Sequence, residues 1–399
     1  MRQLLLTKGH IMIYIDNSAT TKQYGEVTEI MLKYMEDSFG NPSSLYQLGI
    51  DSERALKTAR KQIEKALGTE GLGKVYFTSG GTEADNMAIF GAVKSLRRAG
   101  KRIVTSKVEH PAVLECCKRL EKEGFEVIYI DVDRRCRLDM EHMERSIDEN
   151  TVLVSIMHVN NEVGSIMPIN DIKRIMKEKK SPGLLHCDAV QSFGKIKAPD
   201  SADLISVSGH KIHGPKGTGA IYIRNGVKIP SFMEGGGQEN GLRSGTENVP
   251  AIAGFGKAAE LSYENLLRDM EYMGKIRNRL LEGLRGNLDD VVINSPEEIG
   301  QRASECCPSL LSVSFLGTRG EVLLHTLEQD GIYVSTGSAC SSNKKGQSHV
   351  LKAMGLKDRD IEGTIRFSLG RFNTIEEADI VVEKVTEAVN RFRKLGSFR

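Results

Sequence analysis

One run of the sequence reads Val75-Tyr76-Phe77-Thr78-Ser79-Gly80-Gly81-Thr82-Glu83-Ala84. Its apolar first part predicts a buried strand, and its last part opens a helix. The two glycines between them let the backbone approach an anion closely, and the helix N-terminus adds free N–H groups and a favourable dipole. The run matches neither the Walker A loop nor the Gly-x-Gly-x-x-Gly fingerprint of dinucleotide sites. It is therefore either a phosphate-binding turn that includes Gly81 and Thr82 or an ordinary connection between strand and helix.

Strand and helix patterns alternate on both sides of this run. Short apolar segments predict further strands at residues 13–15, 103–105, 127–130, 152–157, 184–186, 204–207 and 220–223. Residues 53–67 carry apolar side chains at helical spacing before Gly68, and a second helix begins at Pro111. Strands that alternate with helices of this length predict right-handed βαβ units. We therefore expect an α/β fold with a mainly parallel sheet.

The pattern changes after about residue 250. Residues 250–285 predict a long, charged helical connector, and strands follow at 312–315, 332–334 and 365–368. Thr374 and Glu377 form a capping-box pattern at the start of a last helix. These elements predict a second, smaller α+β domain, in agreement with the length of 399 residues.

Composition narrows the class of protein. The 55 Lys and Arg residues nearly balance 53 Asp and Glu, which argues against an electrostatic nucleic-acid binder. No apolar run approaches the roughly 18 residues of a membrane helix. Seven cysteines over so long a chain do not predict a disulfide framework. We expect a soluble cytoplasmic enzyme that keeps its thiols reduced.

Lys211 is a candidate nucleophile. It ends the run Ser208-Gly209-His210-Lys211, directly after the predicted strand 204–207. Ligand crevices of α/β sheets lie at the carboxyl ends of such strands, and burial there favours the uncharged amine that forms Schiff bases. A surface lysine in a glycine-rich loop is the alternative. His213 lies nearby, but no carboxylate or cysteine cluster completes a zinc site, and we expect no metal.

Asp188 ends another apolar run, Leu184-Leu185-His186-Cys187-Asp188. A buried carboxylate needs a partner. A protonated pyridine nitrogen is one such partner, and it is what makes pyridoxal phosphate an electron sink. A helix N-cap or a structural ion pair would account for Asp188 equally well.

Two further polar residues stand at chemically suggestive places. His110 lies between a strand and a helix, where an imidazole could stack on a planar cofactor and move protons; an incidental loop histidine is the alternative. Arg366 is flanked by apolar strand residues and suits bidentate capture of a substrate carboxylate. A structural salt bridge is its alternative role.

Cys340 differs from the other six cysteines in its surroundings. It lies in a small, polar segment, residues 335–347, beside Lys344 and Lys345. An accessible thiol near cations is a candidate thiolate nucleophile. Cys187 lies in an apolar run, Cys116 and Cys117 in an amphipathic segment, and Cys306 and Cys307 before Pro308. All six other cysteines are interpreted as structural or incidental.

These residues belong to an ordered set of motifs. The set consists of Asp16-Asn17-Ser18-Ala19-Thr20-Thr21, Gly40-Asn41-Pro42-Ser43-Ser44, residues 79–86, His158-Val159-Asn160-Asn161-Glu162, Asp188-Ala189-Val190-Gln191, Ser208-Gly209-His210-Lys211, Gly235-Gly236-Gly237-Gln238-Glu239, Arg243-Ser244-Gly245-Thr246 and Ser338-Ala339-Cys340. With these motifs the sequence resembles the pyridoxal-phosphate-dependent cysteine desulfurases of the NifS and IscS type, group I, within the class-V aminotransferases of fold type I. The likeness covers nearly the whole chain.

The resemblance implies a large cofactor-binding domain at 16–264 and a small domain, built from 1–15 and 265–399, that carries the Cys340 loop. It implies that Lys211 is the Schiff-base lysine and Cys340 the nucleophile. The implied cofactor contacts are Asp188 to the pyridine nitrogen, His110 stacked on the ring, Asn161 and Gln191 to the phenolic oxygen, and Gly81, Thr82, Ser208 and His210 around the phosphate. Thr246 would reach the phosphate from the other subunit of a homodimer. Arg366, with Asn161, would bind the substrate carboxylate.

The implied reaction turns L-cysteine into L-alanine and leaves a persulfide on Cys340. The persulfide would pass to a sulfur-acceptor protein, for Fe–S assembly, tRNA thiolation or another thio-cofactor, and Cys340 could also be a transient Fe–S ligand. Tyr46, where many relatives carry His, and residues 343–347 depart from the family pattern. A selenocysteine lyase and a degenerate scaffold homologue are the alternative functions.

Overall fold

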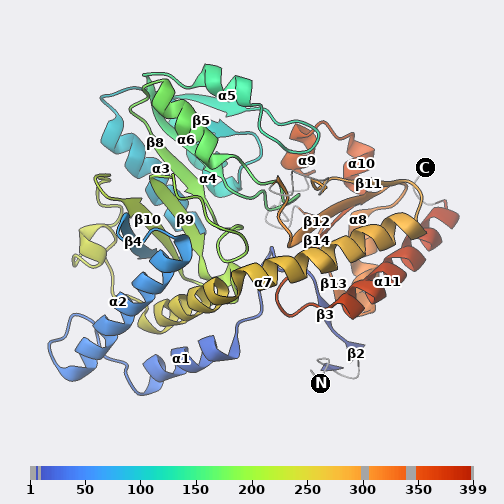
Figure 1. Ribbon diagram of the computed structural model, residues 1–399, viewed down its shortest axis with the longest axis horizontal. Helices are drawn as coiled ribbons and strands as arrows, with labels where there is room; N and C mark the ends of the chain where they lie inside the picture. Colours follow the sequence, from blue (N-terminus) through green and yellow to red (C-terminus); the bar gives the residue numbers. More distant parts are fainter. Residues whose placement is uncertain (1–5, 8–9, 298–304, 338–346, 397–399) are drawn as a thin grey trace.

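The computed structural model describes residues 6–7, 10–297, 305–337 and 347–396. Within these residues the chain forms a large α/β region and a smaller α+β region, which one long helix joins (Figure 1).

A seven-stranded sheet forms the centre of the large region. Its strands, in spatial order, are β4 (Gly73–Thr78), β10 (Gly219–Arg224), β9 (Leu204–Ser208), β8 (Leu184–Asp188), β7 (Thr151–Met157), β5 (Arg102–Ser106) and β6 (Glu126–Ile130). The last five run parallel, whereas β10 is antiparallel to both β9 and β4. The prediction of a mainly parallel sheet in an α/β fold is confirmed.

Helices cover both faces of this sheet. On one face lie α3 (Gly81–Leu96) and α4 (Pro111–Lys122), whose apolar residues form one core with the strands. On the other lie α2 (Gln47–Leu67), α5 (Met140–Ser146), α6 (Ile169–Glu178) and the first part of α7 (Val249–Asn287). α1 (Gly25–Glu36) packs on α7. Both faces of the sheet are therefore buried, which explains why its strands are continuous apolar runs in the sequence.

The smaller region has its own apolar core around a three-stranded antiparallel sheet. The sheet consists of β11 (Val291–Ile293), β12 (Leu310–Phe315) and β14 (Thr364–Ser368), accompanied by α8 (Gly320–Gln329) and α11 (Ile375–Lys394). The short helices α9 (His349–Ala353) and α10 (Asp358–Glu362) pack their apolar residues into the core of the large region. β3 (Ile13–Tyr14) pairs with β13 (Ile332–Tyr333), and β1 (Leu6–Thr7) with β2 (His10–Ile11). The N-terminal strand β3 thus joins a region made mostly of C-terminal residues.

Local signals in the sequence correspond to observed helix ends. Gly68 ends α2 in the left-handed conformation, with φ 69°. Pro111 lies in the first turn of α4. The capping box of Thr374 and Glu377 is present at the start of α11, and the expected connector is α7, 39 residues long.

Candidate active site

A cavity of about 250 Å³ lies at the carboxyl ends of β7, β8 and β9. These strands are neighbours in the sheet. Met157, the last residue of β7, pairs in register with Asp188, the last residue of β8. Most of the predicted site residues line this cavity: Gly81, Thr82, His110, Asn161, Asp188, Gln191, Ser208, His210, Lys211 and Arg366. Residues from positions 81 to 366 therefore meet at the sheet edge where ligands of α/β proteins bind.

One end of the cavity is built to hold an anion. α3 begins at Gly81 directly after β4, so the free N–H groups of its first turn lie at the cavity wall. A Cβ added to Gly81 would come within 2.6 Å of Val190 Cγ2, so only glycine allows α3 to begin this close to Val190. Thr82, Ser208 and His210 line both this end and an adjoining cavity of about 430 Å³. The interpretation of the turn as a phosphate site fits this geometry.

Lys211 ends a short 3-10 turn, Gly209–Lys211, that follows β9. Its side chain is buried, with 8% exposed, and Nζ donates hydrogen bonds to the carbonyl oxygens of Ser18 and Ala19. The alternative of a surface lysine is therefore wrong. Its amine faces the same cavity as Asp188, at the end of the neighbouring strand.

Asp188 is a buried carboxylate that accepts the backbone N–H of Val190 through Oδ1, at 2.9 Å. Burial raises the pKa of Asp188 to about 6, the charge of Asp85 acts in the same direction, and His110 opposes it. A cationic group placed in the cavity beside Asp188 would favour the ionised carboxylate. Asp188 could therefore hold a ligand with a basic ring nitrogen.

His110 is the N-cap of α4. Its Nδ1 accepts the backbone N–H of Ala112 at 3.2 Å, a contact that orients the imidazole at the cavity wall. The side chain has a capping role as well as a position in the site.

Arg366 forms the structural salt bridge considered for it and also lines the cavity. Its Nη2 lies 2.7 Å from Asp16 Oδ1, and its Nη1 donates to the carbonyl oxygen of Asn161 at 3.0 Å. Its Nε is buried and has no hydrogen-bond partner among the described residues. The guanidinium group is therefore held in place by Asp16 while it lines the cavity and retains a donor.

One predicted residue lies outside the cavity, and another lies outside the described residues. Thr246 is exposed and does not belong to its lining. Cys340 lies outside the described residues. The other six cysteines are all buried free thiols; burial raises the pKa of Cys116 to about 12, for example, which makes it a poor nucleophile. Their interpretation as structural thiols agrees with this burial.

The sequence interpretation missed Asp85 and Lys195. Asp85 lines the cavity three residues after Thr82, and its Oδ1 lies 3.5 Å from His186 Nε2. Lys195 is buried behind Gln191. Helical spacing from the glycine turn could have identified Asp85, since residues i and i+3 share a helix face.

Together these groups could hold an elongated planar ligand. Backbone and hydroxyl donors at the anion end suit a phosphate, Asp188 suits a basic ring nitrogen, and Lys211 supplies an amine between them.

Among the described residues there is no cluster of three or more His, Cys, Asp or Glu that could hold a metal ion. No helix in the described ranges is long and apolar enough to span a bilayer.

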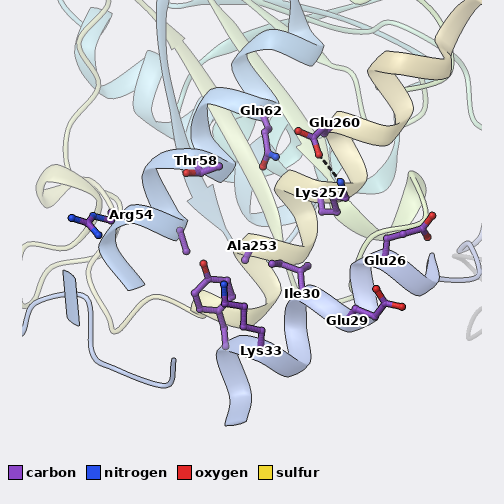
Figure 2. Close-up of a pocket in the computed structure, with 12 residues that line it drawn as sticks. Glu26, Glu29, Ile30, Lys33, Arg54, Thr58, Gln62, Ala253, Lys257 and Glu260 are labelled. Atoms are coloured by element: carbon purple, nitrogen blue, oxygen red, sulfur yellow. Dashed lines mark hydrogen bonds and ion pairs between the residues drawn. The ribbon is translucent and has the colours of Figure 1, made fainter. Parts of the chain in front are cut away.

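A larger cavity of about 630 Å³ lies between α1, α2 and α7, away from these strand ends (Figure 2). Acidic and basic side chains alternate around it, and Lys257 and Glu260 form an ion pair at 2.8 Å. It lacks the convergent donors of the smaller cavity, and size alone does not make it a ligand site.

Comparisons with known proteins agree with this geometry. Residues 13–381 match the model of the family "Aminotransferase class-V". The chain is 43% identical to "Cysteine desulfurase IscS" of Clostridium botulinum over 387 residues, 96% of each protein. It is 45% identical to "Cysteine desulfurase IscS" of Methanosarcina thermophila, covering 96% of this chain and 93% of that protein. A solved structure described as a NifS-like protein has a TM-score of 0.88 at 40% identity and covers 96% of this chain and 100% of the other.

Proposed function

Because the chain belongs to the class-V aminotransferase family, among the cysteine desulfurases of the IscS and NifS type, we propose that it removes sulfur from L-cysteine with pyridoxal phosphate as cofactor. The observation that carries the proposal is the position of Lys211. This buried amine faces Asp188 from the neighbouring strand end, in a cavity that also has an anion site and an arginine.

The residues around the cavity fit pyridoxal phosphate. The phosphate would lie at the N-terminus of α3, beside Thr82, Ser208 and His210. Asp188 would face the pyridine nitrogen, and His110 would lie against the ring. Asn161 and Gln191 would contact the phenolic oxygen. When bound, the cofactor supplies an electron sink for bonds broken next to the substrate's amino group.

The chain's own groups would then act on the substrate. Arg366 lines the cavity, is held in place by Asp16 and the Asn161 carbonyl, and would bind the carboxylate of L-cysteine. Lys211 would hold the cofactor through its amine and, with the substrate bound, would take the proton from Cα. The Ser18 and Ala19 carbonyl oxygens accept hydrogen bonds from its amine and orient it during that transfer.

Cys340 would accept the sulfur. Its thiolate attacks the sulfur of the substrate, the carbon–sulfur bond breaks, and a sulfur–sulfur bond forms on the enzyme. The electron pair of the broken bond stays with the substrate carbon, which is protonated to give L-alanine. Overall, L-cysteine and the Cys340 thiol become L-alanine and a Cys340 persulfide, with no external oxidant. A sulfur-acceptor protein in the cytoplasm would remove the persulfide sulfur, for example for Fe–S assembly.

A homodimer would complete the site. Thr246 is exposed on this chain and would reach the phosphate site of the second subunit. Large apolar side chains are also exposed on and after α1, including Phe39 and Leu45, the latter 94% exposed. Burial of these side chains between two subunits would stabilise the pair. Light scattering should give twice the monomer mass.

The division into a domain of residues 16–264 and a second domain of residues 1–15 and 265–399 is likewise a proposal. The separate apolar core of the smaller region supports it, since that core joins Ile13 and Ile15 to residues from Met273 onward. The boundary at 264–265 would fall inside α7.

Visible spectroscopy and product analysis test the function. The purified protein should be yellow with pyridoxal phosphate and should release sulfide and L-alanine from L-cysteine in the presence of a thiol reductant. Lys211→Ala should lose the bound-cofactor absorption, whereas Cys340→Ser should keep it and release no sulfide. A colourless protein that pyridoxal phosphate cannot reconstitute contradicts the proposal. Faster selenide release from selenocysteine than sulfide release from cysteine would instead indicate a selenocysteine lyase.

A further inference from the structure

Lys195 is a buried amine behind the candidate site, in the turn after β8. Its side chain is 7% exposed, and Nζ donates a hydrogen bond to Gln191 Oε1 at 2.9 Å. In the described part of the chain this partner is an amide oxygen rather than a carboxylate, and Lys195 forms no ion pair there, although Asp269 lines the same small cavity. A positive charge buried in this way costs folding free energy. Its presence beside the cavity therefore points to a role in the site.

The hydrogen bond from Lys195 determines which way the Gln191 amide points. The amide oxygen faces the ammonium group, and Nε2 donates to the carbonyl oxygen of Ser18 at 3.0 Å. A flipped amide would place its N–H₂ against an ammonium group and its oxygen against a carbonyl oxygen, so both contacts would be repulsive. Gln191 lines the cavity, and its fixed orientation leaves an N–H to donate there.

The same contacts connect Lys195 to Lys211. The carbonyl oxygen of Ser18 accepts hydrogen bonds from both Gln191 Nε2 and Lys211 Nζ. Lys195 and Lys211 also line one small cavity of about 20 Å³, which has room for about one water molecule. Besides burial, the positive charge of Lys211 lowers the pKa of Lys195. Because this repulsion is mutual, a charged Lys195 disfavours a charge on Lys211.

Other titratable groups contribute to the charge at Lys195. Burial lowers the pKa of Lys195 to about 8, and the charges of Lys211 and Arg366 act in the same direction. Cys307 acts against them. The titratable and charged groups around this position on other elements are Tyr24, His210, Lys211, His213, Asp269, Cys307, Arg366 and Arg371.

We propose that Lys195 is a positioning residue of the site: it holds the Gln191 amide with its N–H₂ end toward the cofactor cavity and places a positive charge behind Lys211. The proposal rests on the proposed function, because Gln191 would donate to the phenolic oxygen of pyridoxal phosphate. It assigns to Lys195 no contact with substrate or cofactor.

Two variants separate the hydrogen bond from the charge. Lys195→Met removes both, whereas Lys195→Gln keeps an N–H donor without charge. The exposed Lys197, two residues on, provides the matched control Lys197→Met. Each protein is titrated with pyridoxal phosphate to obtain a dissociation constant, and the visible absorption of the loaded protein is then followed against pH. Thermal unfolding checks that each variant is folded.

For Lys195→Met we expect the dissociation constant to rise about fivefold, the effect of one lost hydrogen bond. The pH midpoint of the visible absorption should move upward by about one unit, because the cation that disfavours a proton on the Lys211 nitrogen is gone. Lys195→Gln should bind pyridoxal phosphate almost as tightly as the wild type, but its pH midpoint should stay shifted as in Lys195→Met. Lys197→Met should match the wild type in both measurements.

An unchanged midpoint in a folded Lys195→Met or Lys195→Gln protein overturns the electrostatic role. An unchanged dissociation constant in Lys195→Met overturns the role of the hydrogen bond. These outcomes differ from failure of the proposed function, in which the wild-type protein itself would show no visible band with pyridoxal phosphate.

Discussion

Replacing Glu239 tests how the motif Gly235-Gly236-Gly237-Gln238-Glu239 is fixed to the central sheet. The Glu239 carboxylate is 3% exposed and forms two hydrogen bonds at 2.8 Å with the guanidinium group of Arg60. It also accepts the backbone N–H of Phe77 at 2.9 Å. Since Phe77 lies in β4, the strand that leads into the anion turn, one carboxylate ties α2, β4 and the loop that carries Thr246 together.

The size of the effect follows from these contacts. Glu239→Ala leaves the Arg60 guanidinium and the Phe77 N–H without their acceptor, and removal of one partner from a buried ion pair costs about 3–5 kcal/mol. Glu239→Gln keeps one amide oxygen but loses the charge, so we expect about 2 kcal/mol. The double replacement Arg60→Leu with Glu239→Leu leaves no lone charge and should cost less than Glu239→Ala alone.

Thermal and urea unfolding of the cofactor-free protein measure these differences. The midpoint of Glu239→Ala should fall by about 4–6 °C. Glu271→Ala is the control, because its ion pair with Lys275 is exposed on α7 and should contribute nothing measurable. A loss below about 1 kcal/mol for Glu239→Ala, or a double variant as unstable as the single one, would refute the reasoning.

Three further predictions follow from the site and its surroundings. Arg366→Lys loses the planar fork and should raise the KM for L-cysteine about tenfold with a smaller change in kcat, measured by sulfide release; equal KM values would contradict the assignment. Gly81→Ala places a Cβ 2.6 Å from Val190 Cγ2 and should weaken pyridoxal phosphate binding about tenfold by displacing the start of α3, as an absorbance titration would detect. Burial lowers the pKa of His158 from 6.5 to about 4. Protonation of this histidine therefore favours the unfolded chain. The free energy of unfolding that the neutral histidine contributes above pH 6.5 is lost as the pH falls toward 4. At pH 5 this loss is about 2 kcal/mol, and His158→Gln should reduce the difference in unfolding free energy between pH 7 and pH 5 by that amount.

Most of the fold could be predicted because its signals are local. Apolar spacing and Gly68 identify α2, and runs buried on both faces identify the parallel strands. The antiparallel direction of β10 follows from the short connection that leads to it from β9. This connection has too few residues for the crossover helix that a parallel neighbour would need. The boundary between the two regions is harder to predict, because α7 continues unbroken from one core into the other.

The candidate site was predictable where residues follow strands or carry a family motif, as Lys211 and Asp188 do. Asp85 and Lys195 were missed because their importance arises from burial beside residues distant in sequence, such as His186 and Ser18. The spacing of residues in the sequence does not identify a side chain whose role depends on its contact with another residue.

The double role of Arg366 is a similar case. Its pairing with Asp16 joins residues 350 positions apart, so only the folded chain reveals that the arginine is both ion-paired and directed at the cavity.

The most direct test of the central claim is the yield of sulfide and L-alanine when the purified protein, loaded with pyridoxal phosphate, is given L-cysteine and a thiol reductant. We expect equal amounts of the two products from the wild type, neither product from Lys211→Ala, and no sulfide from Cys340→Ser although its cofactor remains bound. Undiminished sulfide release by Lys211→Ala, or pyruvate in place of L-alanine from the wild type, would contradict it.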